Sequence, residues 1–170
     1  MALSDDGQTV AIGAPDNDDN GSFSGHVRVY SFDGTTWTQV GADIDGENAS
    51  DFSGTAVALS ADGQTVAIGA PGNDDNGSAS GHVRVYTLNG TTWTQQGQDI
   101  DGENTFDQSG RAVALSADGQ TVAIGAPDND DNGSFSGHVR VYSFDGTTWT
   151  QVGADIDGEN AGDSLSLIHI

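Results

Sequence analysis

The string DGQTVAIGAP occupies residues 6–15 and returns unchanged at 62–71 and 118–127, a spacing of 56 residues. Two shorter strings follow it in every copy: GHVRVY at 25–30, 81–86 and 137–142, and GTTWTQ at 34–39, 90–95 and 146–151. Residues 7–49 and 119–161 are identical letter for letter. A fixed period of this size is typical of repeat architectures, in which one supersecondary unit packs on the next. The sequence therefore predicts three copies of one structural unit.

The middle copy contains four strand signals. AVALS (56–60) and TVAIGA (65–70) flank an Asp-Gly turn, and TVAIGA alternates large Val and Ile with small Ala and Gly. HVRVYTL (82–88) and TTWTQQG (91–97) flank Asn89-Gly90, the strongest short hairpin signal in the chain. No window shows a helical period. Each copy is thus predicted to be a four-stranded antiparallel unit, with the segment from Gln98 to Gly110 as a connection to the next copy.

Four antiparallel strands, with tight turns alternating with long loops, are typical of a β-propeller blade. We therefore predict an all-β fold, a β-propeller fragment of three four-stranded antiparallel blades that form an open arc and an incomplete ring. Blade 1 would span 1–57 with a truncated first strand, blade 2 would span 58–113, and blade 3 would span 114–164. A β-solenoid is the structural alternative, although its rungs are usually shorter than this repeat.

The strand pattern also predicts how the blades pack. The Val, Ile and Leu face of one sheet is expected to press against Ala and Gly on the next blade, which allows a close approach near the axis. The tryptophans at the start of the outer strand are expected to bridge to a neighbouring blade; they are Trp37, Trp93 and Trp149.

Both ends of the chain fall inside a repeat. Met1 stands where the other copies have Val57 and Val113. At the other end, LSLIHI (165–170) departs from the repeat and matches the translation of a common transposon-end sequencing adaptor. We interpret residues 165–170 as adaptor read-through and expect further blades of the same chain; a genuine divergent apolar tail is the alternative.

The composition is strongly acidic. The chain has 26 Asp and Glu residues against four arginines, a net charge of −22 and no cysteine. Such a charge disfavours binding to nucleic acid and anionic membranes, and no apolar run is long enough for membrane insertion. The acidity suits a secreted or cell-surface location rich in salt or calcium, with solubility alone as the alternative.

The segment GAP, at 13–15, 69–71 and 125–127, follows an apolar strand and precedes GHVRVY. This arrangement resembles the FG-GAP repeat of integrin α-subunit propellers and of bacterial surface proteins, over residues 2–163. The Phe-Gly element is interrupted in Phe52-Ser53-Gly54. The calcium loop of the family should lie between the first two strands, where this chain has only a short SADG or SDDG turn, so that metal site does not carry over. The resemblance implies adhesion or ligand binding rather than catalysis.

SFDGTTW, at 31–37 and 143–149, looks like the Asp-box of sialidase-type propellers, although it is one residue shorter. That motif is structural in its own family. A sialidase also needs an asymmetric site with three arginines, whereas Arg28, Arg84 and Arg140 occupy equivalent positions of three repeats. The sequence therefore predicts no enzymatic activity and no catalytic residue.

Strand order predicts that the loops between strands 2 and 3 and the links between blades emerge on one face of the propeller. This loop face would carry 20 of the 26 acidic residues, namely Asp16, Asp18, Asp19, Asp43, Asp45, Glu47, Asp51, Asp74, Asp75, Asp99, Asp101, Glu103, Asp107, Asp128, Asp130, Asp131, Asp155, Asp157, Glu159 and Asp163. Carboxylates this crowded favour a cation, and oxygen ligands without cysteine suit Ca²⁺ better than Zn²⁺, with His26, His82 and His138 each occurring singly.

The best local candidate for a Ca²⁺ site matches the first half of an EF-hand-type loop. Its predicted ligands are Asp16, Asp18 and Asn20 in the first copy and Asp128, Asp130 and Asn132 in the third. The twelfth position is Val27 instead of Glu, and Gly72 replaces the first ligand in the middle copy. A solvated loop without metal is the alternative.

These observations predict a non-enzymatic propeller segment whose acidic loop face binds a protein or glycan ligand, with Ca²⁺ as a candidate cofactor. Two alternatives stay open: a purely structural acidic spacer or stalk, and the non-catalytic propeller part of a larger hydrolase. Ligand binding predicts loops that differ between blades, whereas a spacer predicts loops that do not.

Overall fold

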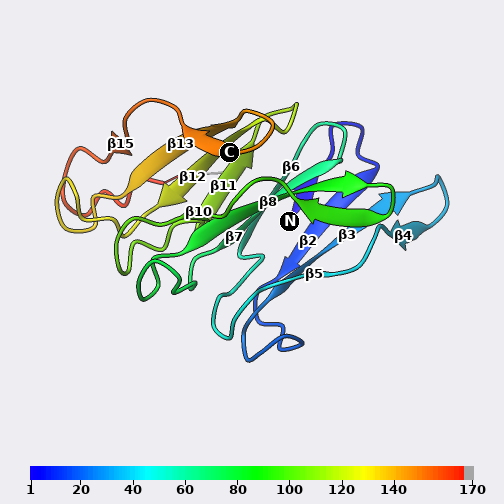
Figure 1. The fold of residues 1–170 in the computed structure, drawn as a ribbon, viewed down its shortest axis with the longest axis horizontal. Helices are drawn as coiled ribbons and strands as arrows, with labels where there is room; N and C mark the ends of the chain where they lie inside the picture. Colours follow the sequence, from blue (N-terminus) through cyan, green and yellow to red (C-terminus); the bar gives the residue numbers. More distant parts are fainter. Residues whose placement is uncertain (167–170) are drawn as a thin grey trace.

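The computed structural model describes residues 1–166, which form three antiparallel sheets and no helix (Figure 1). The first sheet contains β1 (Ala2–Leu3), β2 (Thr9–Ala14), β3 (His26–Phe32), β4 (Trp37–Gln39) and β5 (Ile44–Asp45). The second contains β6 (Ala56–Leu59), β7 (Thr65–Ala70), β8 (His82–Asn89), β9 (Thr92–Gln95) and β10 (Ile100–Asp101). The third contains β11 (Ala112–Leu115), β12 (Thr121–Ala126), β13 (His138–Phe144), β14 (Trp149–Gln151) and β15 (Ile156–Asp157).

Every strand pairs with strands of its own sheet, in the order first, second, third and fourth strand of the repeat. In the middle sheet Ile68 pairs with Arg84, and Asn89 pairs with Thr92 across the predicted hairpin. Within residues 1–166 no sheet closes on itself or continues into the next, as it would in a solenoid, and the only β-pairing between neighbouring blades is in isolated bridges such as Gly25–Ser53. The three sheets lie side by side as the predicted blades of an open arc (Figure 1).

The fourth strand differs from the prediction. It is divided into two short strands that both pair with the third strand, as β4 and β5 pair with β3. The chain turns between them at Gly41, which has a φ of +75°. In blade 2 the second half of the fourth strand is β10, Ile100–Asp101, which the sequence analysis assigned to the connection between blades. That assignment was wrong, because these residues pair with Val83 and His82 of β8.

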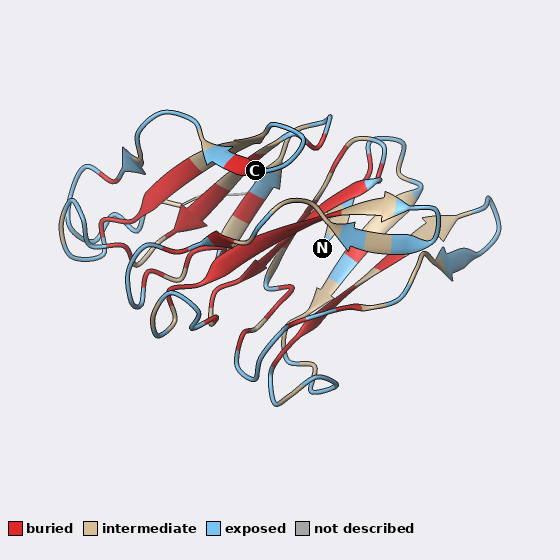
Figure 2. Ribbon diagram, in the orientation of Figure 1, coloured by how far each residue is buried: buried red, intermediate tan, exposed pale blue. Residues whose placement is uncertain are grey.

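The core lies between the blades rather than within one of them. In the first junction Ala11, Val27 and Val29 of the first sheet pack against Val66 and Ile68 of the second. The large-against-small packing is as predicted, but its direction is reversed, because the Val and Ile face of each sheet meets the blade that precedes it. Strand β7 is buried along its whole length, since a blade covers it on each side (Figure 2).

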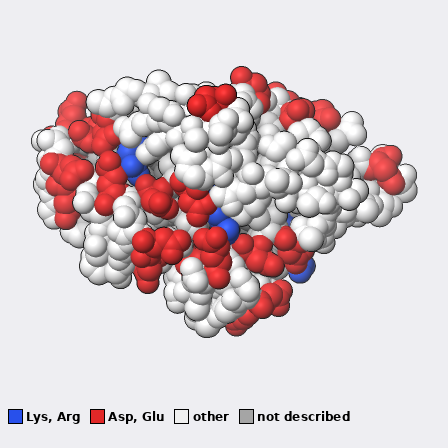
Figure 3. All heavy atoms as spheres, viewed as in Figure 1, with Lys and Arg blue, Asp and Glu red and all other residues white. Residues whose placement is uncertain are grey.

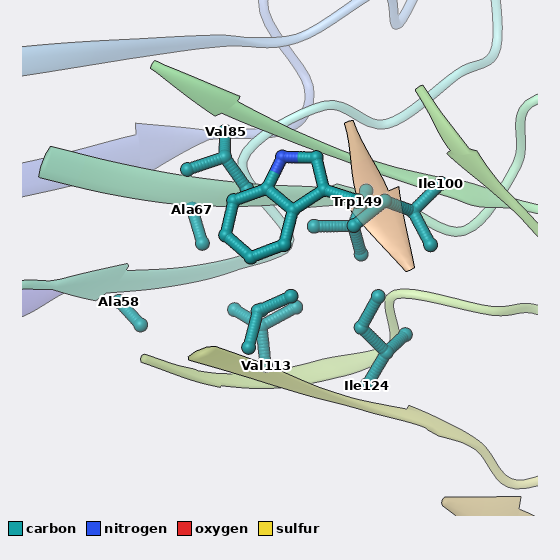
Figure 4. Close-up of a cluster of buried hydrophobic side chains, with 9 residues drawn as sticks. Ala58, Ala67, Val85, Ile100, Val113, Ile124 and Trp149 are labelled. Atoms are coloured by element: carbon teal, nitrogen blue, oxygen red, sulfur yellow. The ribbon is translucent and has the colours of Figure 1, made fainter. Parts of the chain in front are cut away.

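The second junction has the same construction. Ala67, Val85 and Ile100 of the second sheet meet Ile124 and Trp149 of the third (Figure 4). Trp149 donates a hydrogen bond from its indole Nε1 to the carbonyl oxygen of Gln96, at 2.6 Å. Trp93 does the same to Val40 of the first blade, at 2.8 Å. The tryptophans of the second and third copies therefore bridge blades, as the sequence predicts.

The GAP segment has its glycine because two backbones meet there. A Cβ atom on Gly13 would overlap the carbonyl oxygen of Gly54, and one on Gly69 would overlap that of Gly110. Gly54 and Gly110 lie just before the first strands of the next blades. The glycine of one GAP segment thus allows close contact with the backbone segment that leads into the first strand of the following blade.

The first strands of blades 2 and 3 begin at Ala56 and Ala112, near the boundaries drawn at 57/58 and 113/114. Of residues 165–170, only Leu165 and Ser166 belong to the described part, and residues 167–170 lie outside it. The backbone N–H of Leu165 donates to the carbonyl oxygen of Ser136 at 2.8 Å, as Ser109 does to Ser80.

Candidate functional site

Acidic side chains gather along the side of the molecule where the loops between the second and third strands and the links between blades emerge (Figures 1 and 3). The loop and link of one copy contact each other: Asn20 donates from its side-chain Nδ2 to the carbonyl oxygen of Gly46, at 2.7 Å. The equivalent bonds join Asn76 to Gly102 and Asn132 to Gly158. These bonds place both segments on the predicted loop face.

The residues predicted to bind Ca²⁺ hold the loop together in this structure. The Oδ1 atom of Asp18 accepts a hydrogen bond from the backbone N–H of Phe23 at 2.8 Å, and Asp130 does the same for Phe135 at 2.6 Å. Asn20 and Asn132 donate their side-chain amides to the link, as described above.

The remaining two predicted ligands differ from each other. Asp128 accepts a hydrogen bond from the side-chain Nε2 of Gln108 at 2.5 Å, which ties the loop of blade 3 to the preceding link. Asp16 is exposed. No group of converging metal-ligating side chains found in the described chain includes Asp16, Asp18, Asp128 or Asp130.

Carboxylates converge instead around the histidine that begins the third strand of each blade. In blade 2 the group consists of Asp75 from the loop, His82 from β8, Asp99 just before β10, and Glu47 from the link of blade 1. One ligand atom from each residue lies within 4.8 Å of the others. We call this group the first junction cluster.

The second junction cluster is its repeat, made of Glu103, Asp131, His138 and Asp155. The Nδ1 atom of His138 lies 3.9 Å from Oδ2 of Asp155 and 4.0 Å from Oε2 of Glu103. In the first junction cluster, Nδ1 of His82 lies 3.8 Å from Oδ2 of Asp99. These separations are too long for hydrogen bonds.

Both histidine side chains are only 1% exposed, and the Nδ1 atom of each has no hydrogen-bond partner. Buried polar atoms in folded proteins are nearly always paired, and an unpaired one costs about 1–3 kcal/mol. The carboxylates, by contrast, are anchored, because Oδ1 of Asp155 accepts a hydrogen bond from Gln151 at 2.5 Å and Asp99 accepts one from Gln95. One oxygen of each carboxylate is thus held in place while the other faces the histidine.

An arginine from the same strand crosses each junction. Arg84 forms an ion pair between its Nη1 atom and Oε1 of Glu47 at 3.0 Å, and it donates from Nη2 to the carbonyl oxygen of Asp45. Arg140 makes the same two contacts with Glu103 and Asp101. The repeated arginine of blades 2 and 3 therefore compensates acids of the preceding blade.

The electrostatics of the first junction cluster show that its negative charge is only partly compensated. Burial raises the pKa of Glu47, and Asp99 and Asp75 raise it further, although Arg84 opposes them. Burial, with Arg84 as the second cause, lowers the pKa of His82 despite three nearby aspartates. The histidine is therefore neutral at pH 7, and a lone pair of its imidazole is free to accept a proton or bind a cation.

The first blade has an incomplete version of the cluster, made of Asp19, His26 and Asp43. No glutamate of a preceding blade reaches it in this chain, and Arg28 turns to its own blade, pairing with Asp43 at 2.8 Å. The hydrogen bond from Arg28 is the main cause that lowers the pKa of Asp43.

Sequence reasoning missed these clusters because it treated each histidine as isolated. Within one repeat the cluster residues are far apart in the chain, at Asp75, His82 and Asp99, and the fourth ligand comes from the preceding repeat. Recognising the second half of the fourth strand would have brought Asp99 near the third strand, since Ile100 and Asp101 pair with Val83 and His82.

The tight turns between the first and second strands are closed by short side-chain hydrogen bonds. Asp62 accepts hydrogen bonds from the hydroxyl of Ser60 and the backbone N–H of Gln64, and these bonds lower its pKa. The turn is closed by its own side chains, as the short SADG sequence predicts.

A model of the FG-GAP repeat family matches residues 37–86 and 93–142, which is more than half of the chain. The chain therefore belongs to the FG-GAP repeat family, as the sequence resemblance predicted. The matched segments begin at the fourth strand of one blade and run into the third strand of the next, so they span the junctions just described. No curated protein matches the chain.

Solved structures support the propeller-type fold. The chain is similar to hydrazine synthase of Kuenenia stuttgartiensis, with a TM-score of 0.52 and 14% identity over 94% of this chain and 36% of that one. It is also similar to a putative 6-phosphogluconolactonase of Bacteroides uniformis, with a TM-score of 0.56 and 16% identity over 91% of this chain and 39% of that one. The chain thus spans well under half the length of either structure, and the likeness concerns the fold alone. Within residues 1–166 there is no helix long and apolar enough to cross a membrane.

Proposed function

We propose that these repeats form a non-enzymatic, ligand-binding segment of a secreted or cell-surface protein, and that the acidic loop face is the binding surface. The observation that supports the proposal is the repetition of the acids on one face. The same loop and link, joined by the same asparagine hydrogen bond, recur in all three blades. An array of similar negative sites suits a ligand that is itself repetitive and is either cationic or bridged by cations.

Ca²⁺ is the cation proposed for this face. Its preference for carboxylate and carbonyl oxygens matches the loops, where Asp16 is exposed beside Pro15 and Asp128, beside Pro127, has one oxygen bonded to Gln108. The ligand proposed is a protein or a glycan, which the face would hold through shared Ca²⁺. Nucleic acid and membrane insertion are not part of the proposal, because the net charge of −22 repels polyanions.

The first test is calorimetric melting in millimolar CaCl₂ and in NaCl of equal ionic strength. Binding to the folded form raises the free energy of unfolding by about 2.7 kcal/mol at a hundredfold excess over Kd, whereas NaCl only screens repulsion. The double variant Asp16→Ala/Asp128→Ala should lose most of the excess shift. Asp33→Ala/Asp145→Ala is the matched control, since it removes two carboxylates of the same copies from the opposite turns. Equal shifts in CaCl₂ and NaCl would remove Ca²⁺ from the proposal.

A second candidate function is a structural spacer, and one observation favours it. Residues 7–49 and 119–161 are identical, so the loops of blades 1 and 3 carry no difference that could recognise different parts of a ligand. A glycan array probed in CaCl₂ and in EDTA separates the two functions. Calcium-dependent binding that Asp16→Ala/Asp128→Ala weakens supports a ligand-binding face, and uniform absence of binding supports the spacer.

A further inference from the structure

We propose that each blade junction is a binding site for a divalent first-row transition metal ion, with zinc as the representative ion. The ligands are one histidine and three carboxylates: Glu47, Asp75, His82 and Asp99 in the first junction cluster, and Glu103, Asp131, His138 and Asp155 in the second. These sites are separate from the Ca²⁺ proposed for the loops, because they share no residue with it and contain a nitrogen ligand.

The histidine is the observation that distinguishes these clusters from ordinary acidic surface. A crowd of exposed carboxylates needs no ion, but the imidazoles of His82 and His138 are 1% exposed and point an unpaired Nδ1 atom into the carboxylates. Buried ring nitrogens without a hydrogen-bond partner are rare in proteins. A bound metal ion would give the Nδ1 atoms of His82 and His138 the partner that they lack.

The distances suit an ion placed between the ligands. The Nδ1 atom of His138 lies 3.9 Å from Asp155 and 4.0 Å from Glu103, and that of His82 lies 3.8 Å from Asp99. Two ligands of a tetrahedral zinc ion, each about 2.1 Å from the metal, are about 3.4 Å apart. These histidine–carboxylate separations therefore need to shorten by about half an ångström, and no two ligand atoms of a cluster lie more than 4.8 Å apart.

The charge balance also suits a divalent ion. Three carboxylates and the guanidinium of Arg84 leave two formal negative charges uncompensated in the first junction cluster, which one dication would neutralise.

The nitrogen ligand decides the class of metal. Imidazole suits zinc, copper, nickel and iron, while Ca²⁺ takes oxygen ligands almost exclusively. Since Glu47 and Glu103 come from the blade before the one that carries the histidine, the ion would join consecutive blades. Zinc would therefore stabilise the arc itself.

The test is a zinc titration of the untagged chain carrying His169→Ala, so that the histidines are those at 26, 82 and 138. Equilibrium dialysis should give two zinc ions per chain, one for each junction cluster. Asp75→Asn should lower the count to one, because it removes a ligand and leaves the Arg84–Glu47 ion pair in place. Glu47→Gln should also lower the count to one, although it removes the ion pair with Arg84 as well, and it serves as the second variant.

Two controls match these variants. Glu159→Gln changes the glutamate equivalent to Glu47 in the third copy, and Asp19→Asn changes the aspartate equivalent to Asp75 in the incomplete cluster of blade 1. Both should leave the count at two. Cobalt, used as a visible probe of nitrogen ligation, should give an absorption spectrum that changes in His82→Gln. Melting of each variant without metal verifies that it is folded.

The proposal is overturned if the chain binds no zinc, or if Glu159→Gln lowers the count as much as Glu47→Gln, which would indicate diffuse binding to acids. It is also overturned if CaCl₂ displaces zinc at equal concentration, because the nitrogen ligand would then confer no selectivity. None of these results depends on the loop-face experiment, which measures Ca²⁺ and different residues.

Discussion

Blades 1 and 3 have the same sequence from residue 7 to 49 and from 119 to 161, yet equivalent side chains differ in exposure. Trp37 is 45% exposed and Trp149 is 4% exposed, whereas Ile44 is 6% exposed and Ile156 is 55% exposed. The reason is position: blade 3 has a neighbour on its tryptophan side, and blade 1 has a neighbour on its isoleucine side. The tryptophan and isoleucine side chains are therefore buried by the adjacent blade and not by their own sheet.

The same comparison extends to charge. Arg28 folds back onto Asp43 of its own blade with 41% of its side chain exposed, whereas Arg140 is 4% exposed and reaches Glu103 and Asp101 of the preceding blade. Identical local sequence therefore produces an exposed ion pair in one blade and an inter-blade contact in the other. Pairwise mutations in blades 1 and 3 can measure what each junction adds.

The largest difference is expected for tryptophan. Trp149→Ala should lower the free energy of unfolding by about 3–5 kcal/mol, because it empties a buried site and removes the hydrogen bond to Gln96. Trp37→Ala should cost less than about 1 kcal/mol, since that ring contacts mainly Phe32 and solvent. Urea unfolding of both variants tests the comparison. Equal costs would mean that the tryptophan stabilises its own sheet.

Isoleucine should show the reverse order. Ile44→Ala is expected to cost about 2–4 kcal/mol, because Ile44 belongs to the core between blades 1 and 2. Ile156→Ala should change the free energy of unfolding by no more than about 0.5 kcal/mol. The measurement is again urea unfolding, and a larger effect of Ile156→Ala than of Ile44→Ala would contradict the assignment of the two faces.

A smaller effect is expected at a pair of turn glycines. Gly41 and Gly153 have φ values of +75° and +78°, so alanine is strained equally at both, at about 1–2 kcal/mol. A Cβ atom at Gly41 would also lie 2.9 Å from Cδ1 of Trp93, while nothing lies within 4 Å at Gly153. Gly41→Ala should therefore exceed Gly153→Ala by about 1–3 kcal/mol in thermal unfolding. Equal costs would leave only backbone strain.

The smallest effect concerns pH and the middle blade, which has neighbours on both sides. Burial, with help from Arg84, lowers the pKa of His82 in the folded state. The unfolded chain therefore binds a proton first as pH falls through about 6.5. The contribution of the neutral His82 to the free energy of unfolding is therefore complete above that pH. It is lost progressively as pH falls further, with a slope of up to about 1.4 kcal/mol per pH unit.

The measurement is urea unfolding of wild type and His82→Gln between pH 7.5 and pH 5, in metal-free buffer at constant ionic strength. The difference between the two curves isolates the histidine from the carboxylates, since the raised pKa of Glu47 works in the opposite direction on lowering pH. A difference that does not change with pH would show that His82 takes up its proton equally well in the folded state.

Most of the fold could be predicted from the sequence because its signals are local. The alternation in TVAIGA and HVRVY determines strands, Asn89-Gly90 determines a hairpin, and the repeat multiplies both. The second half of the fourth strand could not be predicted, since Ile100-Asp101 is too short to show alternation and becomes a strand only by pairing with Val83 and His82. The direction of packing between blades was also beyond the sequence.

The candidate sites also divide into features that the sequence predicts and features that only the tertiary structure shows. By itself the sequence determined the number of repeats and the acidic face, because both depend on residue type and spacing along the chain. Only the tertiary structure decided that Asp18 and Asn20 bond to backbone, and that His82 meets Asp99 of its own blade and Glu47 of the previous one. Such contacts depend on how neighbouring blades stack, and no spacing within a single repeat specifies that geometry.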